Sequence, residues 1–126
     1  MSSFLTVALG GAIGASARHG LSLAMLRLFG PGFPIGTLLA NVIGGLLMGV
    51  LIGWLLREST ETTNAIRLFA GVGILGGFTT FSAFSLEAFR MLEDKTYGLF
   101  FGYVGASVIL SIAAVALGLF IMRSSL

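Results

Sequence analysis

Four apolar stretches of membrane-spanning length take up almost the whole chain, at residues 4–26, 35–56, 66–89 and 97–122. A helix needs about 20 predominantly apolar residues to cross a bilayer, whereas a strand needs about 10. In hydrocarbon a spanning segment also has to satisfy all of its backbone polar groups within the protein. The sequence therefore predicts an all-α integral membrane protein with four transmembrane helices, forming a single domain over residues 1–126.

The composition excludes several other classes of protein. Of the 126 residues, 56% are hydrophobic and 10% are charged, whereas soluble domains carry about 25% charged residues. The chain has no cysteine and one histidine, which excludes disulfide scaffolds, thiolate metal sites and zinc sites built from several histidines. The net charge of +2 is too small and too dispersed to indicate nucleic-acid binding. No enzyme motif is present, and the first apolar stretch is expected to be a retained helix because no basic segment precedes it.

The third stretch contains a polar interruption, residues 76–85, which read GGFTTFSAFS. Glycines before Thr79 and Thr80 weaken helical hydrogen bonding, and this predicts a helix that is broken near the membrane midplane. Such a break is tolerated only where its freed backbone groups face protein, water or an ion. Two copies meeting at a two-fold axis would bring together four or more carbonyls, which suits a small cation. The alternative is a kinked helix whose own Thr and Ser hydroxyls bond the freed groups.

The basic residues show no preference for one side of the membrane. Lys and Arg in short loops set the orientation of a membrane protein. With four spans, the side with both termini holds Arg57, Arg67 and Arg123, and the other side holds Arg27, Arg90 and Lys95. This equal number of basic residues on the two sides predicts a dual-topology antiparallel homodimer, in which two oppositely inserted copies pair. The alternative is that the weak bias only reflects how few charges there are.

Glycines at four-residue spacing predict close helix contacts, because helices in membranes associate through small residues. The predicted contact rows are Gly10 and Gly14 in the first span, Gly45, Gly49 and Gly53 in the second, and Gly98 and Gly102 in the fourth.

Polar side chains inside the first two spans suggest an anion site. Asn41 lies near the start of the second span, and Arg18 lies in the later part of the first. An amide and a guanidinium facing inward are donors that suit an anion better than a cation. The alternative is that Arg18 extends to the lipid headgroups and Asn41 bonds a neighbouring helix. His19 is expected to be an interfacial side chain.

Two phenylalanines follow the interruption. Phe81 and Phe84 share a helix face at i, i+3 spacing, and the positive edge of an aromatic ring can contact an anion. The alternative is that both rings only pack or face lipid. Polar residues surround this pair, namely Ser82, Ser85 and Glu87, and a polar stripe on the fourth span consists of Tyr103, Ser107 and Ser111.

These residues match a known family. The segment 76–85 resembles the signature GG-x-TTFS-x-FS of the Fluc (CrcB) fluoride channels. The resemblance covers the whole chain, including the glycine-rich first helix up to Arg18, the GTLLAN segment at 36–41 and the YVGAS segment at 103–107.

The resemblance implies a fluoride-selective channel that exports cytoplasmic fluoride passively. It further implies a multi-pass protein of the inner (plasma) membrane that forms an antiparallel homodimer with two pores. A structural sodium ion at the dimer interface would be held by the backbone carbonyls of Gly76 and Thr79 from both subunits. The partners expected are therefore fluoride, a second copy of the chain and the lipid bilayer, with no nucleic acid.

The same match implies roles for the pore residues. Phe81 and Phe84 would contact fluoride, Asn41 would cap an inner site, and Arg18 would belong to an aqueous vestibule. A track of polar side chains that lines the pore in this family would correspond to Thr37, Ser82, Ser85 and Glu87 here. The wall that the fourth helix contributes to the pore would correspond to Tyr103 and Ser107. With the whole stripe included, the predicted fluoride pore consists of Thr37, Asn41, Phe81, Ser82, Phe84, Ser85, Glu87, Tyr103, Ser107 and Ser111.

Two other classes fit parts of this pattern. A small dual-topology drug exporter has similar length and spans, but it places a carboxylate in the middle of its first helix, where this chain has no acid and carries Arg18. A non-conducting assembly subunit would share the glycine rows but would not need paired phenylalanines beside a broken helix.

Overall fold

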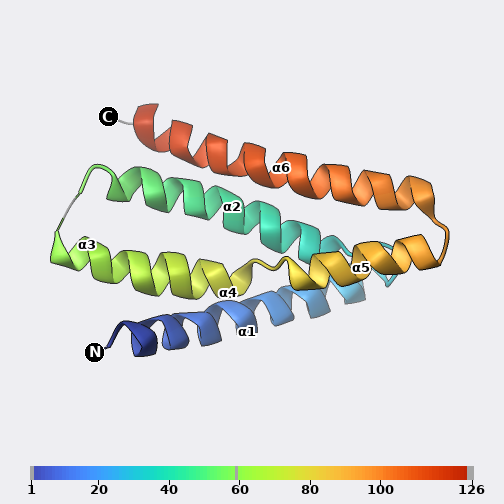
Figure 1. The fold of residues 1–126 in the computed structure, drawn as a ribbon, viewed down its shortest axis with the longest axis horizontal. Helices are drawn as coiled ribbons and strands as arrows, with labels where there is room; N and C mark the ends of the chain where they lie inside the picture. The colour runs from blue at the N-terminus through green and yellow to red at the C-terminus, as the bar shows by residue number, and fades with distance from the viewer. Residues whose placement is uncertain (1, 59, 125–126) are drawn as a thin grey trace.

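A computed structural model describes residues 2–58 and 60–124 as helices joined by short connections (Figure 1). The elements are α1 (Ser3–Phe29), α2 (Ile35–Leu55), α3 (Glu61–Ile66), the π-helix η1 (Arg67–Leu75), α4 (Gly76–Phe78), α5 (Ser82–Glu93) and α6 (Tyr97–Ser124). The elements α3, η1 and α4 follow one another directly, and together with α5 they form the predicted third span. The described residues contain no strand, and the all-α prediction is confirmed.

Three helical segments of the described chain are long and apolar enough to cross a membrane: Ile35–Leu55, Thr62–Glu93 and Tyr97–Ser124. They correspond to the predicted second, third and fourth spans. The helix α1 has 27 residues and is therefore about 40 Å long at 1.5 Å per residue. Arg18 and His19 lower its hydropathy, and it is not among the three. A membrane span at 4–26 stays a prediction.

The four helical segments lie alongside one another on the long axis of the molecule (Figure 1). Both termini and the connection after α2 lie at one end, and the other two turns lie at the opposite end. This is the up-and-down arrangement that four consecutive spans require. The turn after α1 begins at Gly30, whose φ of 77° lies in the left-handed region that glycine adopts without steric cost.

Glycines bring two pairs of helices into backbone contact. A Cβ on Gly14 of α1 would overlap the carbonyl of Ile74 in η1, and one on Gly49 of α2 would overlap the carbonyl of Val115 in α6. Gly10, Gly45 and Gly53 also face close neighbours on these helices. The predicted contact rows of the first two spans are thus confirmed.

The row predicted for the fourth span is wrong within this chain. A Cβ built on Gly98 or Gly102 would meet nothing within 4 Å. Gly118 makes the close contact instead, against the backbone of Leu46 and Val50. The four-residue spacing identified glycines that can pack, but the crossing point of α2 and α6 decides which glycines do.

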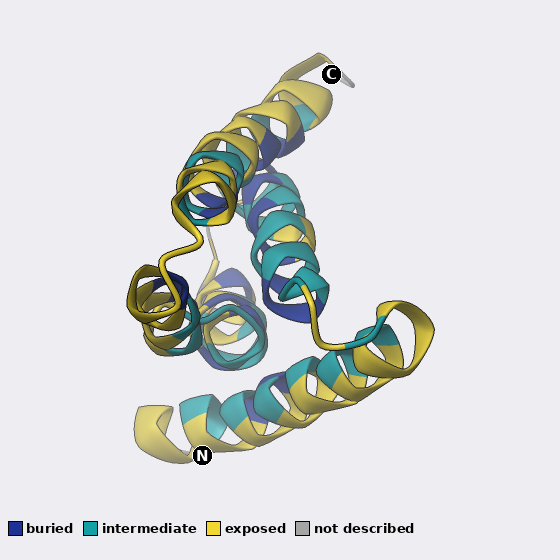
Figure 2. Ribbon diagram, turned by 90° about the vertical axis from the view of Figure 1, so that its right-hand side faces the viewer, coloured by how far each residue is buried: buried dark blue, intermediate teal, exposed yellow. Residues whose placement is uncertain are grey.

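Figure 2 shows buried residues on the sides of the helices that face one another, and the buried hydrophobic cluster lies where α5 and α6 meet. The buried cluster consists of Phe84, Ala88, Met91 and Tyr103. Many large apolar side chains elsewhere are exposed, among them Ile109 and Ile112 on α6. An apolar surface this extensive is expected where a protein faces lipid or a further subunit.

Candidate functional site

The third span is interrupted at the predicted position. Thr79 has an extended backbone, with φ −89° and ψ 156°, and helix resumes only at Ser82. The nine residues before Gly76 form a π-helix, which is rare and is found mostly as short bulges at functional sites. The sequence predicted weakened helical bonding around these glycines, but it did not predict the π-helix.

Asn41 bonds both backbone groups of Thr80 within the break. Its Nδ2 donates to the Thr80 carbonyl at 3.0 Å, and its Oδ1 accepts from the Thr80 amide at 2.7 Å. One side chain of α2 therefore replaces the two hydrogen bonds that Thr80 would make in a continuous helix. The interpretation of Asn41 as a residue that bonds a neighbouring segment is confirmed, and its contact with an anion stays a prediction.

The carbonyls of Gly76 and Thr79 lose their usual donors through the same rearrangement. In a continuous α-helix they would accept from the amides of Thr80 and Ala83, four residues later. The Thr80 amide donates to Asn41 instead, and the Ala83 amide donates to the Thr80 hydroxyl at 3.2 Å. The two carbonyls that the family resemblance assigns to sodium are therefore among those that the break deprives of helical donors.

Side-chain hydroxyls bond other carbonyls near the break. Thr79 donates to the Leu75 carbonyl at 3.0 Å, and Ser85 donates to the Phe81 carbonyl at 2.8 Å. Both carbonyls also keep their helical amide donors, at Thr79 and Ser85, so these two hydroxyls do not bond freed groups. The predicted alternative of a kink sealed by hydroxyls holds for the Ala83 amide, which the Thr80 hydroxyl accepts, and not for the carbonyls of Gly76 and Thr79.

Arg18 contacts the break from α1. Its Nε donates to the carbonyl of Gly77 at 3.2 Å, which adds a charged donor beside the freed backbone. Gly77 itself lies against α1 so closely that a Cβ there would be 2.7 Å from the Gly11 carbonyl. The structure thus places Arg18 against the broken span, while its role in a vestibule stays a prediction.

A second polar cluster links three helices through Glu87 on α5. The Thr37 hydroxyl donates to Glu87 Oε2 at 3.1 Å, and the Tyr103 hydroxyl donates to Oε1 at 2.9 Å. Tyr103 is fully buried, and its ring centroid lies 5.2 Å from that of Phe84 and 5.4 Å from that of Phe33. The carboxylate is therefore held between α2 and α6 by two hydroxyl donors.

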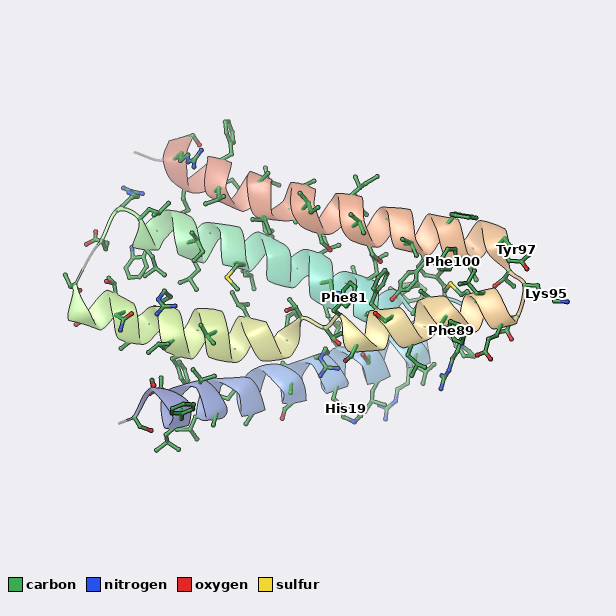
Figure 3. All side chains as sticks on the ribbon, viewed as in Figure 1. His19, Phe81, Phe89, Lys95, Tyr97 and Phe100 are labelled. Atoms are coloured by element: carbon green, nitrogen blue, oxygen red, sulfur yellow. The ribbon has the colours of Figure 1, made fainter. Side chains whose placement is uncertain are left out.

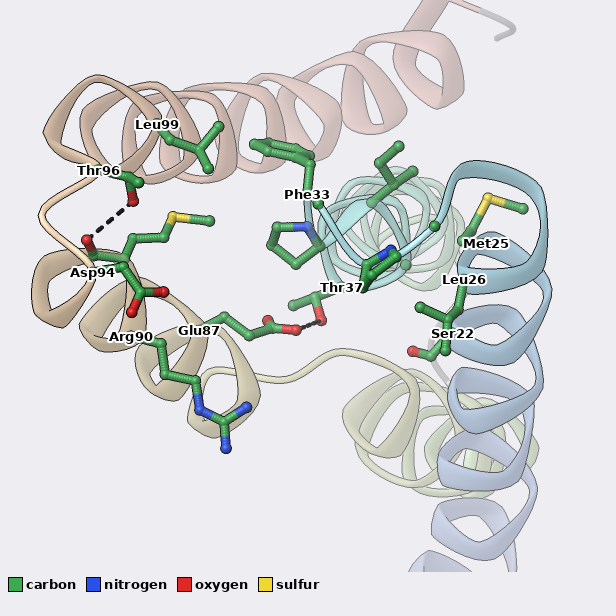
Figure 4. A pocket seen from close by; sticks show the side chains of 17 residues that line it. Ser22, Met25, Leu26, Phe33, Thr37, Glu87, Arg90, Asp94, Thr96 and Leu99 are labelled. Carbon is green, nitrogen blue, oxygen red and sulfur yellow. Dashed lines mark hydrogen bonds between the residues drawn. The ribbon is translucent and has the colours of Figure 1, made fainter.

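Two residues of this cluster, Thr37 and Glu87, line one of two cavities among the described residues. The first, of about 480 Å³, is lined by the turn after α1 and by Thr37, Glu87 and Arg90 (Figure 4). The second is an open groove of about 600 Å³ beside the break. The predicted site residues that line the groove are Asn41, Gly76, Thr79, Phe81, Phe84, Ser107 and Ser111. Residues from three separate spans are thus brought to one groove.

The hydroxyls of Ser107 and Ser111 are buried in the wall of the groove. Neither oxygen has a hydrogen-bond partner among the described residues. Leaving a buried polar group unpaired costs about 1–3 kcal/mol, and such groups in native proteins usually mark a ligand, an ion or a water position. These two hydroxyls are therefore suited to donate to a bound ion.

Residues 5–119 match the family model described as CrcB-like protein, Camphor Resistance (CrcB). The chain belongs to the CrcB family. A relative from Caulobacter vibrioides strain NA1000 / CB15N, named fluoride-specific ion channel FluC, is 47% identical over 98% of this chain and 97% of its own length. Relatives of the same name from Caulobacter sp. strain K31 and Sphingopyxis alaskensis are 50% and 51% identical over 98% of this chain, covering 96% and 97% of their own lengths. The CrcB family comprises ion channels and not enzymes, and the resemblance proposed from the sequence is confirmed.

Two residues predicted for the polar track lie outside both cavities in this CrcB protein. Ser82 and Ser85 are exposed, and Ser85 is bonded to the Phe81 carbonyl. His19 points away from the other helices, and Phe81 lies at the break (Figure 3). Phe81 is 78% exposed, whereas Phe84 is 8% exposed, although their ring centroids are 5.6 Å apart.

Sequence reasoning missed two contributors to the site of this CrcB protein. The backbone of Thr80 is the group that Asn41 binds, and the signal for it was the second threonine of the TTFS segment. Arg90 lines the first cavity. No sequence motif around Arg90 indicates a place at the site, and its charge is the one feature that could have suggested it.

Proposed function

We propose that the chain is a fluoride-selective channel that exports cytoplasmic fluoride passively. It is a multi-pass protein of the inner membrane and works as an antiparallel dual-topology homodimer with two pores. The observation that carries this proposal is the helix break held by Asn41 beside a groove with two unpartnered buried hydroxyls. The names of the relatives support fluoride as the ion.

The path of the ion runs from the first cavity, past the Glu87 cluster, into the groove. Fluoride is small and strongly hydrated, so a pore has to replace its water with several weak donors and still release it. The groove offers the hydroxyls of Ser107 and Ser111 and the N–H of Asn41 that does not bond Thr80. The ring edges of Phe81 and Phe84 add weakly positive surface on the same wall.

A sodium ion fits the break chemically. Sodium is a hard cation that prefers oxygen ligands, and carbonyls without helical donors are such ligands. Gly76 and Thr79 both line the groove, and two copies of the chain would supply four carbonyls. The bound ion would raise the electrostatic potential for anions nearby.

Two observations support the proposed antiparallel dimer, the distribution of charges and the open groove. Three basic residues at each end give no orientation bias, so both orientations insert. The groove is open within one chain, and two apolar residues that line it, Val108 and Ile112, are exposed. A second copy, inserted the other way, would close the groove and complete a sodium site on the two-fold axis.

Fluoride efflux from liposomes that contain the purified protein tests the function. Potassium fluoride is loaded inside, valinomycin releases the counter-charge, and a fluoride electrode records the efflux, with chloride-loaded liposomes as the control. We expect rapid fluoride loss while chloride is retained. Retention of both ions by well-folded protein would refute the channel and favour an exporter or an assembly subunit.

A further inference from the structure

The first cavity has an unusual charge balance for the access route of an anion. Three charged residues line it, Glu87, Arg90 and Asp94, all at α5 or its C-cap (Figure 4). Arg90 is therefore the one cation among the described lining residues, against two carboxylates. With Arg90 neutral, the lining would carry only negative charge.

The guanidinium of Arg90 is not paired with another side chain among the described residues. Its side chain is exposed and makes no hydrogen bond or ion pair with the residues that the structure describes. Glu87, one turn earlier, is bonded to Thr37 and Tyr103 instead. The positive charge of Arg90 therefore acts on the open volume of the cavity and not on a fixed partner.

A single charge at this position has a calculable effect on ions in the cavity. At about 7 Å in water, one unit charge changes the local concentration of a monovalent ion roughly threefold. The effect is screened by salt, because the Debye length falls from about 30 Å at 0.01 M to about 3 Å at 1 M ionic strength. Charges at a channel mouth thus change the rate of ion arrival and not the chemistry of selection.

We propose that Arg90 is an anion-gathering residue, which sets the rate at which fluoride reaches the cluster of Thr37, Glu87 and Tyr103. The proposal rests on the proposed fluoride channel function. Asp94 opposes Arg90 from the same cavity wall, so that removing its charge raises the rate at which fluoride arrives.

Single-channel fluoride currents in planar bilayers test this, recorded at about 10 mM and about 1 M ionic strength with an impermeant salt. We expect R90Q to lower the low-salt current about threefold, D94N to raise it, and the double variant to restore it to near the original value. R90K is expected to behave as the unaltered protein, and all differences should vanish at high salt. The matched control R123Q removes the same charge from α6, away from both cavities, and should change nothing.

The outcomes separate the two proposals. If the unaltered protein conducts fluoride and R90Q conducts equally well at low salt, Arg90 does not gather anions while the channel function stands. A loss in R90Q that persists at 1 M salt or that R90K shares would reveal a structural role and overturn the electrostatic one. If the unaltered protein carries no fluoride current, the proposed function itself fails.

Discussion

The two halves of the third span pack in different ways. Before the break, η1 and α4 meet α1 backbone to backbone, with Gly73 against Gly10 and Gly77 against Gly11. After the break, α5 has no glycine, and it is held by side chains such as Phe84 and Glu87. Close backbone packing leaves no room for side chains, whereas side-chain packing leaves space between helices. Both cavities and most polar site residues accordingly lie along the break, α5 and its neighbours.

The backbone-packed half is expected to be the more sensitive to added volume. In Gly14→Ala the new methyl group overlaps the Ile74 carbonyl, and a backbone group of a packed helix cannot rotate aside. Overpacking costs about 1–3 kcal/mol even where side chains can adjust, so we expect the upper end of this range or loss of folded protein. Thermal unfolding and size-exclusion chromatography in detergent measure the effect.

The matched control for this prediction is Gly20→Ala on the same helix. A Cβ at Gly20 meets nothing within 4 Å, and alanine is the better helix former by up to about 1 kcal/mol. Gly20→Ala should therefore unfold at the same or a higher temperature. Equal melting of both variants would show that backbone contact does not hold this half.

Removing the link between the two halves is expected to have the next largest effect. Asn41→Ala deletes both bonds to Thr80 and leaves two partly buried backbone groups unpaired, at about 1–3 kcal/mol each. We expect a lower melting temperature together with reduced fluoride efflux. Asn64→Ala, at an exposed asparagine on α3, serves as the control and should leave both unchanged. Unaltered efflux in Asn41→Ala would mean that neither the break nor the ion depends on this side chain.

The side-chain-packed half allows stability and conduction to be separated with two phenylalanines. Phe84→Ile removes a buried ring that contacts Tyr103, whereas Phe81→Ile changes an exposed one. Aromatic pairs contribute about 0.5–1.5 kcal/mol, so only Phe84→Ile should lower the melting temperature. If ring edges contact fluoride, efflux falls in both variants. Normal efflux in a stable Phe81→Ile protein would refute the contact at Phe81.

The smallest effect on stability is expected in the wall of the groove. Ser107→Ala and Ser111→Ala remove hydroxyls that have no partner among the described residues, so stability should stay constant or rise by up to about 1 kcal/mol. Fluoride efflux should nevertheless fall, because the groove loses two donors. Gly102→Ala serves as a control on α6, because a Cβ at Gly102 meets nothing within 4 Å. Unchanged efflux in both serine variants would place the ion path elsewhere.

Much of the site was accessible from local sequence patterns. The interruption at Thr79, the pairing of Phe81 with Phe84, and the serine stripe on the fourth span all follow from spacing. What spacing did not reveal was exposure: Phe81 is open and Phe84 is buried, although their i, i+3 spacing predicted a shared helix face, because helix resumes only at Ser82, after Phe81. Ser82 and Ser85 likewise lie beside the break and yet line neither cavity, because the orientation of α5 against α2 and α6 decides which face is covered.

The sequence by itself determined that the chain is helical and membrane-embedded, where its third span breaks, and to which family it belongs. It could do so because hydropathy, glycine content and local motifs act within a few turns of one helix. Only the tertiary structure decided that Asn41 bonds Thr80, that Glu87 bridges Thr37 and Tyr103, and that Gly118 packs where Gly98 and Gly102 do not. The hydrogen-bonded pairs among these contacts join residues 16 to 50 positions apart in the chain. Their partners depend on the crossing points and rotations of whole helices, which no local pattern specifies.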